Sequence, residues 1–336
     1  MGSYWVLFNA VLETPHQAAK DLISEAAVEE EVEAVCAHLK ALGHPCVRYP
    51  LVDIRKLVHD LATPPLLIFN LCEGFRGNAK KEMHVAALLE LLGIPFTGNS
   101  AKTLGIAQDK DLTKRILSSA GIPTPKWMVY RGGTIADDIP LSFPLIVKPA
   151  QEDASLGIEK RNVVRDTGSL NQVAGELYRR YLEPILIEEF LPGREFSVSL
   201  LEVEGELRTL PISEISLEGL GKEGSPLVSY EAKWIEDSPE YKLTPSICPA
   251  PVHEELGKAL RTLAIKTWEI LGGKDYGRVD IRLDGEGKPF VLEFNPNPDI
   301  SLQAGFSKSL KAAGIPYERF LEILIHNNLQ SKEVSP

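Results

Sequence analysis

The sequence has few cysteines and no long apolar segment, and both shortages limit what the protein can be. Its four cysteines, Cys36, Cys46, Cys72 and Cys248, lack zinc-type or redox spacing, so we expect reduced thiols. No stretch approaches the roughly 18 apolar residues of a membrane helix. Residues 1–15 lack the basic segment and apolar run of a signal peptide. We therefore expect a cytoplasmic protein that does not bind membranes.

Positive charge is also scarce. The chain has 47 acidic residues against 36 lysines and arginines, which gives a net charge of −11. Such a balance disfavours binding to nucleic acid or to an anionic membrane, although it still permits a local cationic pocket for phosphates. We expect small-molecule partners and no nucleic acid.

The length allows more than one domain, because a single core stops growing at roughly 250 to 300 residues and the chain has 336. Apolar runs at residues 4–9, 45–51 and 65–71 alternate with helical patterns at 28–42 and 82–93. This alternation predicts an α/β domain over residues 1–100 with an open parallel sheet.

A second unit begins near Ala101, with a helical pattern at residues 108–121 and a buried strand at 143–150 that carries Lys148. Strands dominate after about residue 185, and Glu204–Gly205 is the predicted turn of a hairpin. We therefore expect a central subdomain over residues 101–187 and a C-terminal subdomain over 188–330.

A second hairpin, around the turn sequence DGEG, brings oxygen donors together. Alternation along the strands puts Asp280 on the face of Arg278, and Glu293 on the face of Asn295, opposite Leu292 and Phe294. Two carboxylates and an amide then meet above the sheet, a donor set that suits Mg²⁺ bound with a polyphosphate. The alternative is a solvated face with Arg278 pairing an acid. The following NPNPD, which ends the strand rigidly, favours the metal site.

Two lysines and two glutamates are weaker candidates. Lys110 and Lys148 suit phosphate contacts, and the small-residue loop after Lys148 suits backbone contacts to phosphates. A lysine at a strand end is more often an extended surface residue. Glu188 and Glu195 flank a short apolar link in LIEEFLPGREF, where solvent-facing glutamates are the common alternative.

Six segments in order, DKDLTK, LIVKPAQED, LIEEFLPGREF, YEAKW, GRVDIRLD and VLEFNPNP, resemble the ATP-grasp superfamily and, within it, the D-alanine:D-alanine ligases. The resemblance runs from about Ile68 to Leu324. It implies a three-domain ATP-grasp fold with ATP between the central and C-terminal domains. It also implies a homodimer and a ligase that joins a carboxylate to an amine through an acyl phosphate.

The resemblance implies four groups of site residues. The lysines meet phosphates, Glu188 accepts from the adenine amino group, Glu195 meets the ribose, and the full set of ATP contacts is Lys110, Lys148, Ser155, Glu188, Phe190, Leu191 and Glu195. The ligands of Mg²⁺, as two ions with Mn²⁺ as an alternative, are Asp280, Glu293 and Asn295. The catalytic cations are Arg278, which stabilises the acyl phosphate, and Lys148. The residues that contact the amino-acid or amine substrates are Glu73, Lys233, Arg278 and Asp299.

Departures from the family pattern fall in the amino-acid half of the site. Positions where the family has glycine, serine, histidine or tyrosine are occupied here by Asp153, Ala154, Trp234, Glu73, Asp299 and Ala304. The family's N-terminal glutamate has only approximate counterparts, Glu25 or Glu29, and Glu82 is an alternative carboxylate for a substrate ammonium or a helix cap. Lys233, which grips a substrate carboxylate, is retained.

These patterns favour an ATP- and Mg²⁺-dependent carboxylate–amine ligase with an altered acceptor site. The first alternative is an authentic D-alanine–D-alanine ligase of peptidoglycan precursor synthesis. A non-catalytic ATP-binding regulator would require loss of metal or phosphate ligands, and none of these residues is lost. A phosphotransferase that stops at the acyl phosphate is distinguished only by its products.

Overall fold

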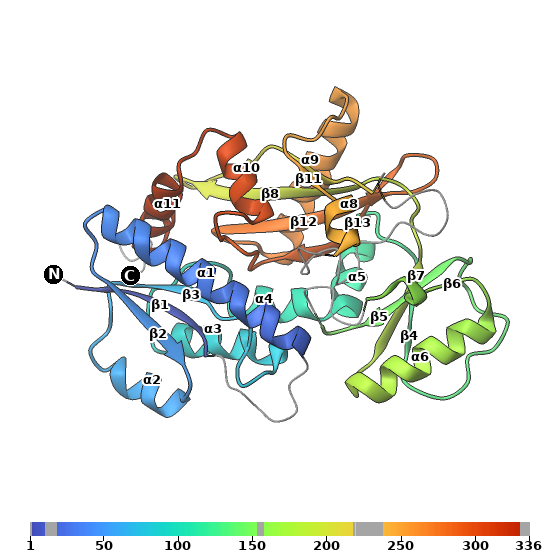
Figure 1. Ribbon diagram of the computed structural model, residues 1–336, viewed down its shortest axis with the longest axis horizontal. Coiled ribbons are helices and arrows are strands. Elements are labelled where there is room, and N and C mark those ends of the chain that lie inside the picture. The colour runs from blue at the N-terminus through green and yellow to red at the C-terminus, as the bar shows by residue number, and fades with distance from the viewer. Residues whose placement is uncertain (1, 11–18, 153–157, 218, 220–237, 330–336) are drawn as a thin grey trace.

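Three β-sheets follow one another along the chain in the computed structural model (Figure 1). The structure describes residues 2–10, 19–152, 158–217, 219 and 238–329. Among the helices in these ranges, none combines the length and apolar character that a bilayer crossing requires.

The N-terminal sheet is parallel, as predicted, in the order β2-β1-β3. Its strands are β1 (Tyr4–Asn9), β2 (Cys46–Leu51) and β3 (Leu67–Leu71). Its helices are α1 (Ala19–Ala41), α2 (Ile54–Asp60), the 3₁₀ turn η1 (Ala79–Lys81) and α3 (Glu82–Leu91). Alternation along β1 sends Val6 and Phe8 into the core under α1, and Leu7 into the core under α2 and α3. Both faces of the sheet are therefore covered.

The central sheet is antiparallel, in the order β4-β7-β5-β6, with α6 packed against it. Its elements are β4 (Trp127–Tyr130), β5 (Leu145–Pro149), η2 (Lys160–Asn162), β6 (Val163–Val164), α6 (Thr167–Tyr181) and β7 (Ile185–Glu189). The domain boundary expected after residue 187 falls inside β7, because that strand pairs with both β4 and β5.

Two helices lie within the range expected for the central subdomain, where one was predicted over residues 108–121, and both pack elsewhere. They are α4 (Ala101–Gln108) and α5 (Lys110–Ser119). Ala107 and Leu117, on these helices, join the same apolar core as Trp268 of the C-terminal part. Lys110 therefore begins a helix that packs against α9 in the C-terminal part.

The C-terminal sheet is antiparallel, in the order β11-β10-β8-β12-β13, with β9 also paired to β8. Its strands are β8 (Glu195–Val203), β9 (Glu206–Thr209), β10 (Ser213–Ile215), β11 (Ser246–Ile247), β12 (Tyr276–Leu283) and β13 (Pro289–Asn295). Its helices are α8 (Pro239–Leu243), α9 (Glu254–Leu271), α10 (Gly305–Ala312) and α11 (Tyr317–Leu329). The predicted turn at Glu204–Gly205 is confirmed, with φ values of 56° and 81°.

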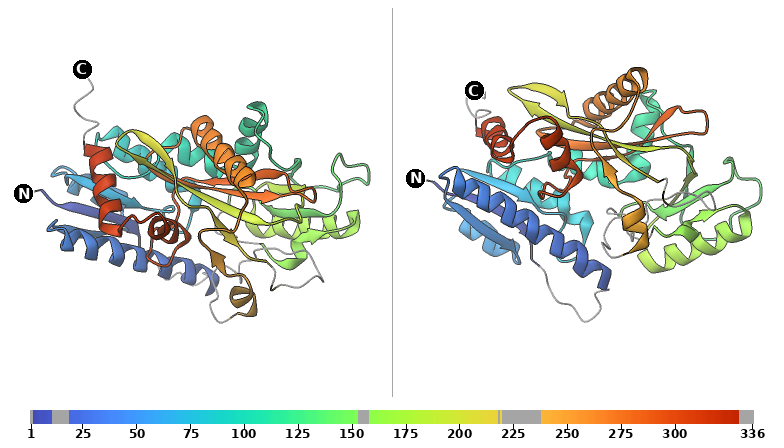
Figure 2. Two further views of the ribbon diagram at one scale, coloured as in Figure 1. Left: turned by 90° about the horizontal axis from the view of Figure 1, so that it is seen from above. Right: turned by 45° about the horizontal axis from the view of Figure 1, so that its top comes forward.

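The N-terminal and C-terminal parts share one core. Figure 2 shows α11 and α10 beside α1, and α11 contacts both α1 and β3. Phe306 and Phe320 from these two helices pack in the same cluster as Val6 and Val32 of the N-terminal sheet and helix. This shared core also contains Leu201 and Tyr276 of the C-terminal sheet, so it joins the two sheets.

A polar network crosses the same junction at Asp275, which is fully buried. Its carboxylate accepts hydrogen bonds from the Gly98 backbone N–H and from the Asn327 and Asn328 side chains at 2.8 to 2.9 Å. The Asn99 amide donates to the Tyr276 carbonyl at 2.8 Å. The segment between α3 and α4, the start of β12 and the end of α11 are thereby tied together.

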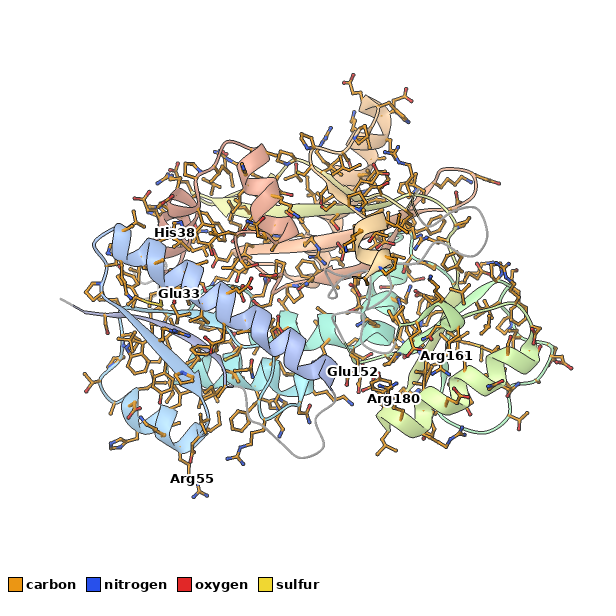
Figure 3. All side chains as sticks on the ribbon, viewed as in Figure 1. Glu33, His38, Arg55, Glu152, Arg161 and Arg180 are labelled. Carbon is orange, nitrogen blue, oxygen red and sulfur yellow. A yellow bond between two sulfur atoms is a disulfide. The ribbon has the colours of Figure 1, made fainter. Side chains whose placement is uncertain are left out.

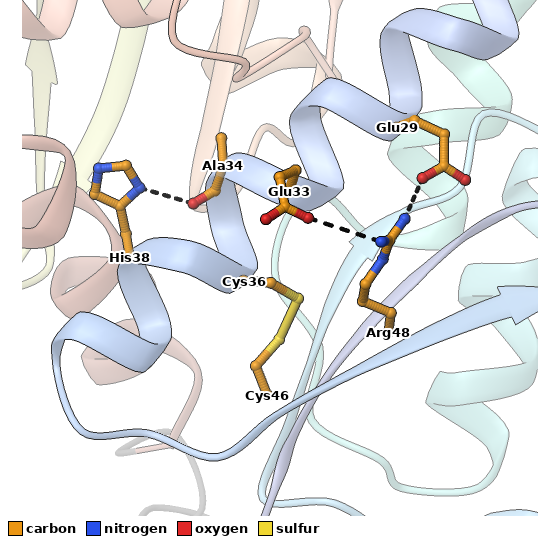
Figure 4. Close-up of a disulfide and its surroundings, with 7 residues drawn as sticks. All are labelled: Glu29, Glu33, Ala34, Cys36, His38, Cys46 and Arg48. Carbon is orange, nitrogen blue, oxygen red and sulfur yellow. Dashed lines mark hydrogen bonds and ion pairs between the residues drawn. A yellow bond between two sulfur atoms is a disulfide. The ribbon is translucent and has the colours of Figure 1, made fainter.

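The expectation that all four cysteines are reduced thiols is wrong for two of them. Cys36 on α1 and Cys46 on β2 form a disulfide, with Cα atoms 5.7 Å apart (Figure 4). The reason is that α1 packs along β2, and a tight turn at Gly43 (φ 79°) reverses the chain between them. This Cα–Cα distance lies in the usual range for a disulfide. The zinc and redox motifs require closely spaced cysteines, so they do not detect two cysteines that are 10 residues apart. Cys72 and Cys248 are free.

Asp275 makes stability depend on pH. Burial raises its pKa from 3.8 to about 6, although its three hydrogen-bond donors oppose that shift. The folded state therefore binds the proton more tightly than the unfolded chain, so this contribution to stability is lost as pH rises through about 6. Relative to Asp275→Asn, the free energy of unfolding of the wild type should fall by about 1 kcal/mol between about pH 5 and about pH 8.

Asparagine suits the control because it tolerates the left-handed backbone at this position (φ 67°). Urea unfolding of both proteins at several pH values measures this, and a difference that does not change with pH contradicts it.

Candidate active site

The β12–β13 hairpin carries the predicted oxygen donors on one face. The register pairs Asp280 with Glu293 and Arg278 with Asn295, as the alternation predicted. One detail differs, because a β-bulge lies between Asp280 and Ile281 on this pairing, and Ile281 is opposite Val291. Val291, and not Leu292, therefore packs with Phe294 in the core.

Arg278 is fixed beside the donors. Its guanidinium donates two hydrogen bonds to the Asp280 carboxylate, both at 2.7 Å, and the Ser197 hydroxyl donates a third at 2.7 Å. Burial lowers the pKa of Arg278, but Asp280 and then Glu293 outweigh it and hold the pKa above its ordinary value. A permanently charged guanidinium is thus held rigidly within the acidic face.

The donor set fits a hard, oxygen-preferring cation. Two carboxylates come from directly opposed residues, and the Asn295 amide oxygen, which accepts from the Asn297 backbone N–H at 3.0 Å, follows on the same face. In the described part of the chain, no three or more His, Cys, Asp or Glu side chains gather as a metal cluster. Mg²⁺ needs no such cluster, because it takes few protein oxygens and completes its shell with water and phosphate.

Lys110 lies close to this face. Its Nζ is 4.0 Å from a Glu293 carboxylate oxygen and donates to the backbone carbonyl of Glu152 at 2.6 Å. Figure 3 labels Glu152 near the middle of the molecule, where the N-terminal and central parts approach each other. Lys110 is 7% exposed, and so is Lys148, for which the alternative was an extended surface lysine at a strand end; both are buried.

Lys148 and Glu188 form a buried ion pair between neighbouring strands. The Lys148 Nζ lies 2.6 Å from the Glu188 Oε1, and the central sheet pairs β5 with β7 here. Glu188 is 2% exposed, so the solvent-facing alternative is wrong for this glutamate. Burial raises the pKa of Glu188, but the opposing effects of Lys114 and then Lys148 are larger together, and they lower the pKa to about 2. Glu188 is therefore a carboxylate at neutral pH.

Sequence reasoning missed Lys114, which is the second cation on Glu188. Its Nζ lies 2.8 Å from the Glu188 Oε2 and donates to the Thr124 hydroxyl at 2.7 Å. A signal was present, because Lys114 comes four residues after Lys110 in α5, and this spacing puts both on one face of a helix. Burial is the main cause that lowers the pKa of Lys114, and Glu188 opposes it.

Glu195, the predicted ribose contact, lies at the start of β8. The Glu195 carboxylate pairs with the Arg282 Nη1 at 2.9 Å, and Arg282 also lies over the Phe190 ring, 4.9 Å from its centroid. Burial raises the pKa of Glu195, and Arg282 opposes it. Phe190 and Leu191 are both buried, and Phe190 packs with Ile146 of β5. The segment between the central and C-terminal sheets is thus held in one position.

Two of the four predicted substrate residues, Glu73 and Asp299, follow the ends of strands from different sheets. Glu73 comes after β3, with its backbone N–H bonded to the Asn9 side chain at 2.7 Å. Asp299 comes after β13, and its carboxylate accepts from the Ser301 N–H at 2.7 Å. Both carboxylates lie close enough to Glu31 to raise its pKa, after the larger effect of burial. The two predicted residues therefore border the same region.

Glu31 is a second residue that sequence reasoning missed. It is 5% exposed, and its carboxylate accepts from the Ile300 backbone N–H at 2.9 Å. Glu29, one of the two approximate candidates on this helix, instead pairs with Arg48, as Glu33 also does at 3.7 Å (Figure 4). One helical turn carries side chains to both sides of α1, so an offset of two residues changes which side the carboxylate faces.

Glu82 has a structural contact. Its carboxylate accepts a hydrogen bond from the Asn297 side chain at 3.0 Å, which links α3 to the segment after β13. Several predicted positions lie outside the described residues and are not placed: Asp153, Ala154, Ser155, Lys233 and Trp234. The side chain of Glu25 also lies outside the described part.

The chain is similar to proteins of known family and structure. Residues 116–326 match the family model described as the D-ala D-ala ligase C-terminus. A D-alanine–D-alanine ligase of Aquifex aeolicus is 31% identical over 294 residues, which are 87% of this chain and 92% of that protein. An uncharacterized protein of Sinorhizobium fredii is 35% identical over 261 residues, 78% of this chain and 74% of its own. The crystal structure of the Bacillus anthracis D-alanine–D-alanine ligase complexed with ATP has a TM-score of 0.76 over 99% of both chains at 23% identity, which confirms the predicted fold.

Proposed function

Because this chain belongs to the D-alanine–D-alanine ligase family and is an ATP-dependent peptide ligase of the ATP-grasp type, we propose that it joins an amino-acid carboxylate to an amine at the site described above. A carboxylate oxygen of the first substrate attacks the γ-phosphorus of ATP, and the bond to the ADP oxygen breaks. The amine nitrogen then attacks the carbonyl carbon of the acyl phosphate, expels phosphate and loses a proton, which leaves an amide.

The observation that carries the proposal is the meeting of cations and oxygen donors at the β12–β13 hairpin. Asp280 and Glu293 face each other across the two strands, and Lys110 lies 4.0 Å from Glu293. Asp280, Glu293 and Asn295 would hold Mg²⁺, which supplies charge neutralisation at the transferring phosphoryl group when it is bound. A solvated surface hairpin would not need a buried lysine at this distance.

Four side chains and one backbone segment would hold the nucleotide around this hairpin. Lys110 and Lys148 are buried cations that suit the phosphates, and Glu188 is an ionised acceptor that suits the adenine amino group. Glu195 suits a ribose hydroxyl through the oxygen that does not pair with Arg282. Phe190 and Leu191 lie between these groups along the chain, where backbone N–H and C=O groups meet the edge of a base in the family.

Arg278 would stabilise charge on the acyl phosphate and on the tetrahedral intermediate. Its two hydrogen bonds to Asp280 prevent the guanidinium from rotating, so little reorganisation is needed when negative charge develops. No side chain of the protein needs to form a covalent bond with the substrate, because the substrate carboxylate is itself the nucleophile.

The acceptor half of the site supports a substrate other than a second D-alanine. Ala304 is the N-cap residue of α10 and makes no side-chain capping bond, whereas the family pattern has a serine that grips the second substrate's carboxylate. Asp299 adds a carboxylate near this position, where that pattern has glycine. A site that loses hydroxyl donors also loses discrimination for the ligand that they held. We therefore propose an acceptor that is bulkier or less polar near its carboxylate.

Removing charge from the metal site should stop turnover. We expect Glu293→Gln and Asp280→Asn each to reduce ATP-dependent phosphate release by about 100-fold or more, because each removes a negative ligand without changing shape. Glu286→Gln is the matched control, since Glu286 lies in the turn of the same hairpin and pairs with Lys288. Near-normal rates at saturating Mg²⁺ in either site variant would show that the hairpin is not the metal site.

The substrate preference should show directly in a panel assay. Phosphate release is measured with D-alanine alone and with D-alanine or L-amino acids plus a range of second amines, and mass spectrometry identifies the products. We expect D-alanyl-D-alanine to form poorly and another pair to have a higher kcat/KM. If D-alanine alone is as good as any pair and the dipeptide is the only product, the protein is an authentic D-alanine–D-alanine ligase and its acceptor site is not altered.

A further inference from the structure

Lys114 is a buried charge at the proposed nucleotide site to which the chemistry above gives no task. It is 1% exposed, and three oxygen atoms lie around its Nζ: the Thr124 hydroxyl at 2.7 Å, the Glu188 Oε2 at 2.8 Å and the Pro125 carbonyl at 3.4 Å. An ammonium group has three N–H bonds, so these acceptors can use all of them. Lys114 is therefore not available to bind a phosphate.

Lys148, unlike Lys114, has N–H bonds available for a ligand. Its ion-pair partner in the described part of the chain is Glu188, at 2.6 Å. One acceptor uses one of its three N–H bonds, which leaves two that can turn to a ligand. Lys148 is also slightly more exposed, at 7%. Of the two lysines on Glu188, Lys148 is the one that can contact phosphates.

The charges of the three residues do not balance. One buried carboxylate faces two buried ammonium groups, which leaves one positive charge in excess. A single lysine on Glu188 would form a closed neutral pair, and moving that lysine toward a phosphate would leave a buried carboxylate without a counter-ion, which is strongly unfavourable. With two lysines, one can turn to a ligand while the other remains.

We propose that Lys114 is a permanent counter-ion of Glu188 that allows Lys148 to turn toward the nucleotide's phosphates. Lys114 is thus a positioning residue, which acts through Glu188 and touches no substrate. Glu188 stays ionised and oriented toward the base while Lys148 engages the phosphates. This inference rests on the proposed function, because it requires Lys148 to contact a phosphate.

The test is a double-mutant cycle in the dissociation constant of ATP, measured by calorimetry with Mg²⁺ present. Lys114→Met should weaken binding by about tenfold or more, because Lys148 is then held by Glu188 alone. In a Glu188→Gln background the same change should weaken binding by less than about threefold, because a neutral glutamine does not hold Lys148. The comparison within the Glu188→Gln background removes the effect of losing the base contact.

A role in packing alone predicts another result, an equal loss of affinity in both backgrounds, which would overturn the inference. Lys288→Met, in the exposed hairpin turn, is the matched control and should bind ATP as the wild type does. Thermal melting checks that each variant is folded. If Lys114→Met does not fold, Lys114→Gln takes its place in both backgrounds, because it keeps a donor toward Glu188 without the charge.

Lys148→Met separates this inference from the proposed function. If Lys148→Met binds ATP as tightly as the wild type, Lys148 is not a phosphate contact, and both that assignment and the inference are wrong. If Lys148→Met weakens binding while Lys114→Met does not, the assignment of Lys148 stands and only the inference is wrong. We expect both variants to bind ATP weakly.

Discussion

The antiparallel pairing of β12 with β13 positions the charged groups on which the site depends. Because successive residues of a strand face opposite sides, a slip of one residue would turn Asp280 or Glu293 into the core. The slip is opposed by Val279, Ile281 and Phe294, which are buried against α9 on the other face. The bulge beside Asp280 keeps this apolar face filled while the two carboxylates stay opposed. Core packing on one face thereby sets the positions of Asp280 and Glu293, the proposed metal ligands, on the other.

Burial of charge is the second constraint, and the protein meets it by pairing. Glu188 has two lysines, Asp280 has Arg278, and Glu195 has Arg282. A buried pair contributes little net stability, but an unpaired buried charge is costly, so these groups are held in defined positions. Preorganised charges of this kind are what phosphoryl transfer requires, because its catalysis depends on positioning and electrostatic stabilisation.

The placement of several candidate site residues could be predicted from the sequence, for identifiable reasons. The hairpin donors followed from strand alternation and a turn sequence, which are local rules, and Lys110 and Lys148 followed from motif order. Lys114 and Glu31 were missed because their importance comes from contacts with Glu188 and Ile300, which are distant in the sequence. The Cys36–Cys46 disulfide joins residues only 10 positions apart, and it was missed because it depends on how α1 packs along β2. Local patterns predict which face a side chain takes, and tertiary packing decides what it meets there.

The central claim is that the substrate carboxylate is phosphorylated before an amide forms, and isotope transfer tests it most directly. An amino acid that supports turnover is labelled with ¹⁸O in both carboxylate oxygens, and the released phosphate is analysed by mass spectrometry. The account predicts one ¹⁸O atom in each phosphate, because the attacking carboxylate oxygen leaves with the phosphoryl group. Unlabelled phosphate, released together with a labelled amide product, would contradict it.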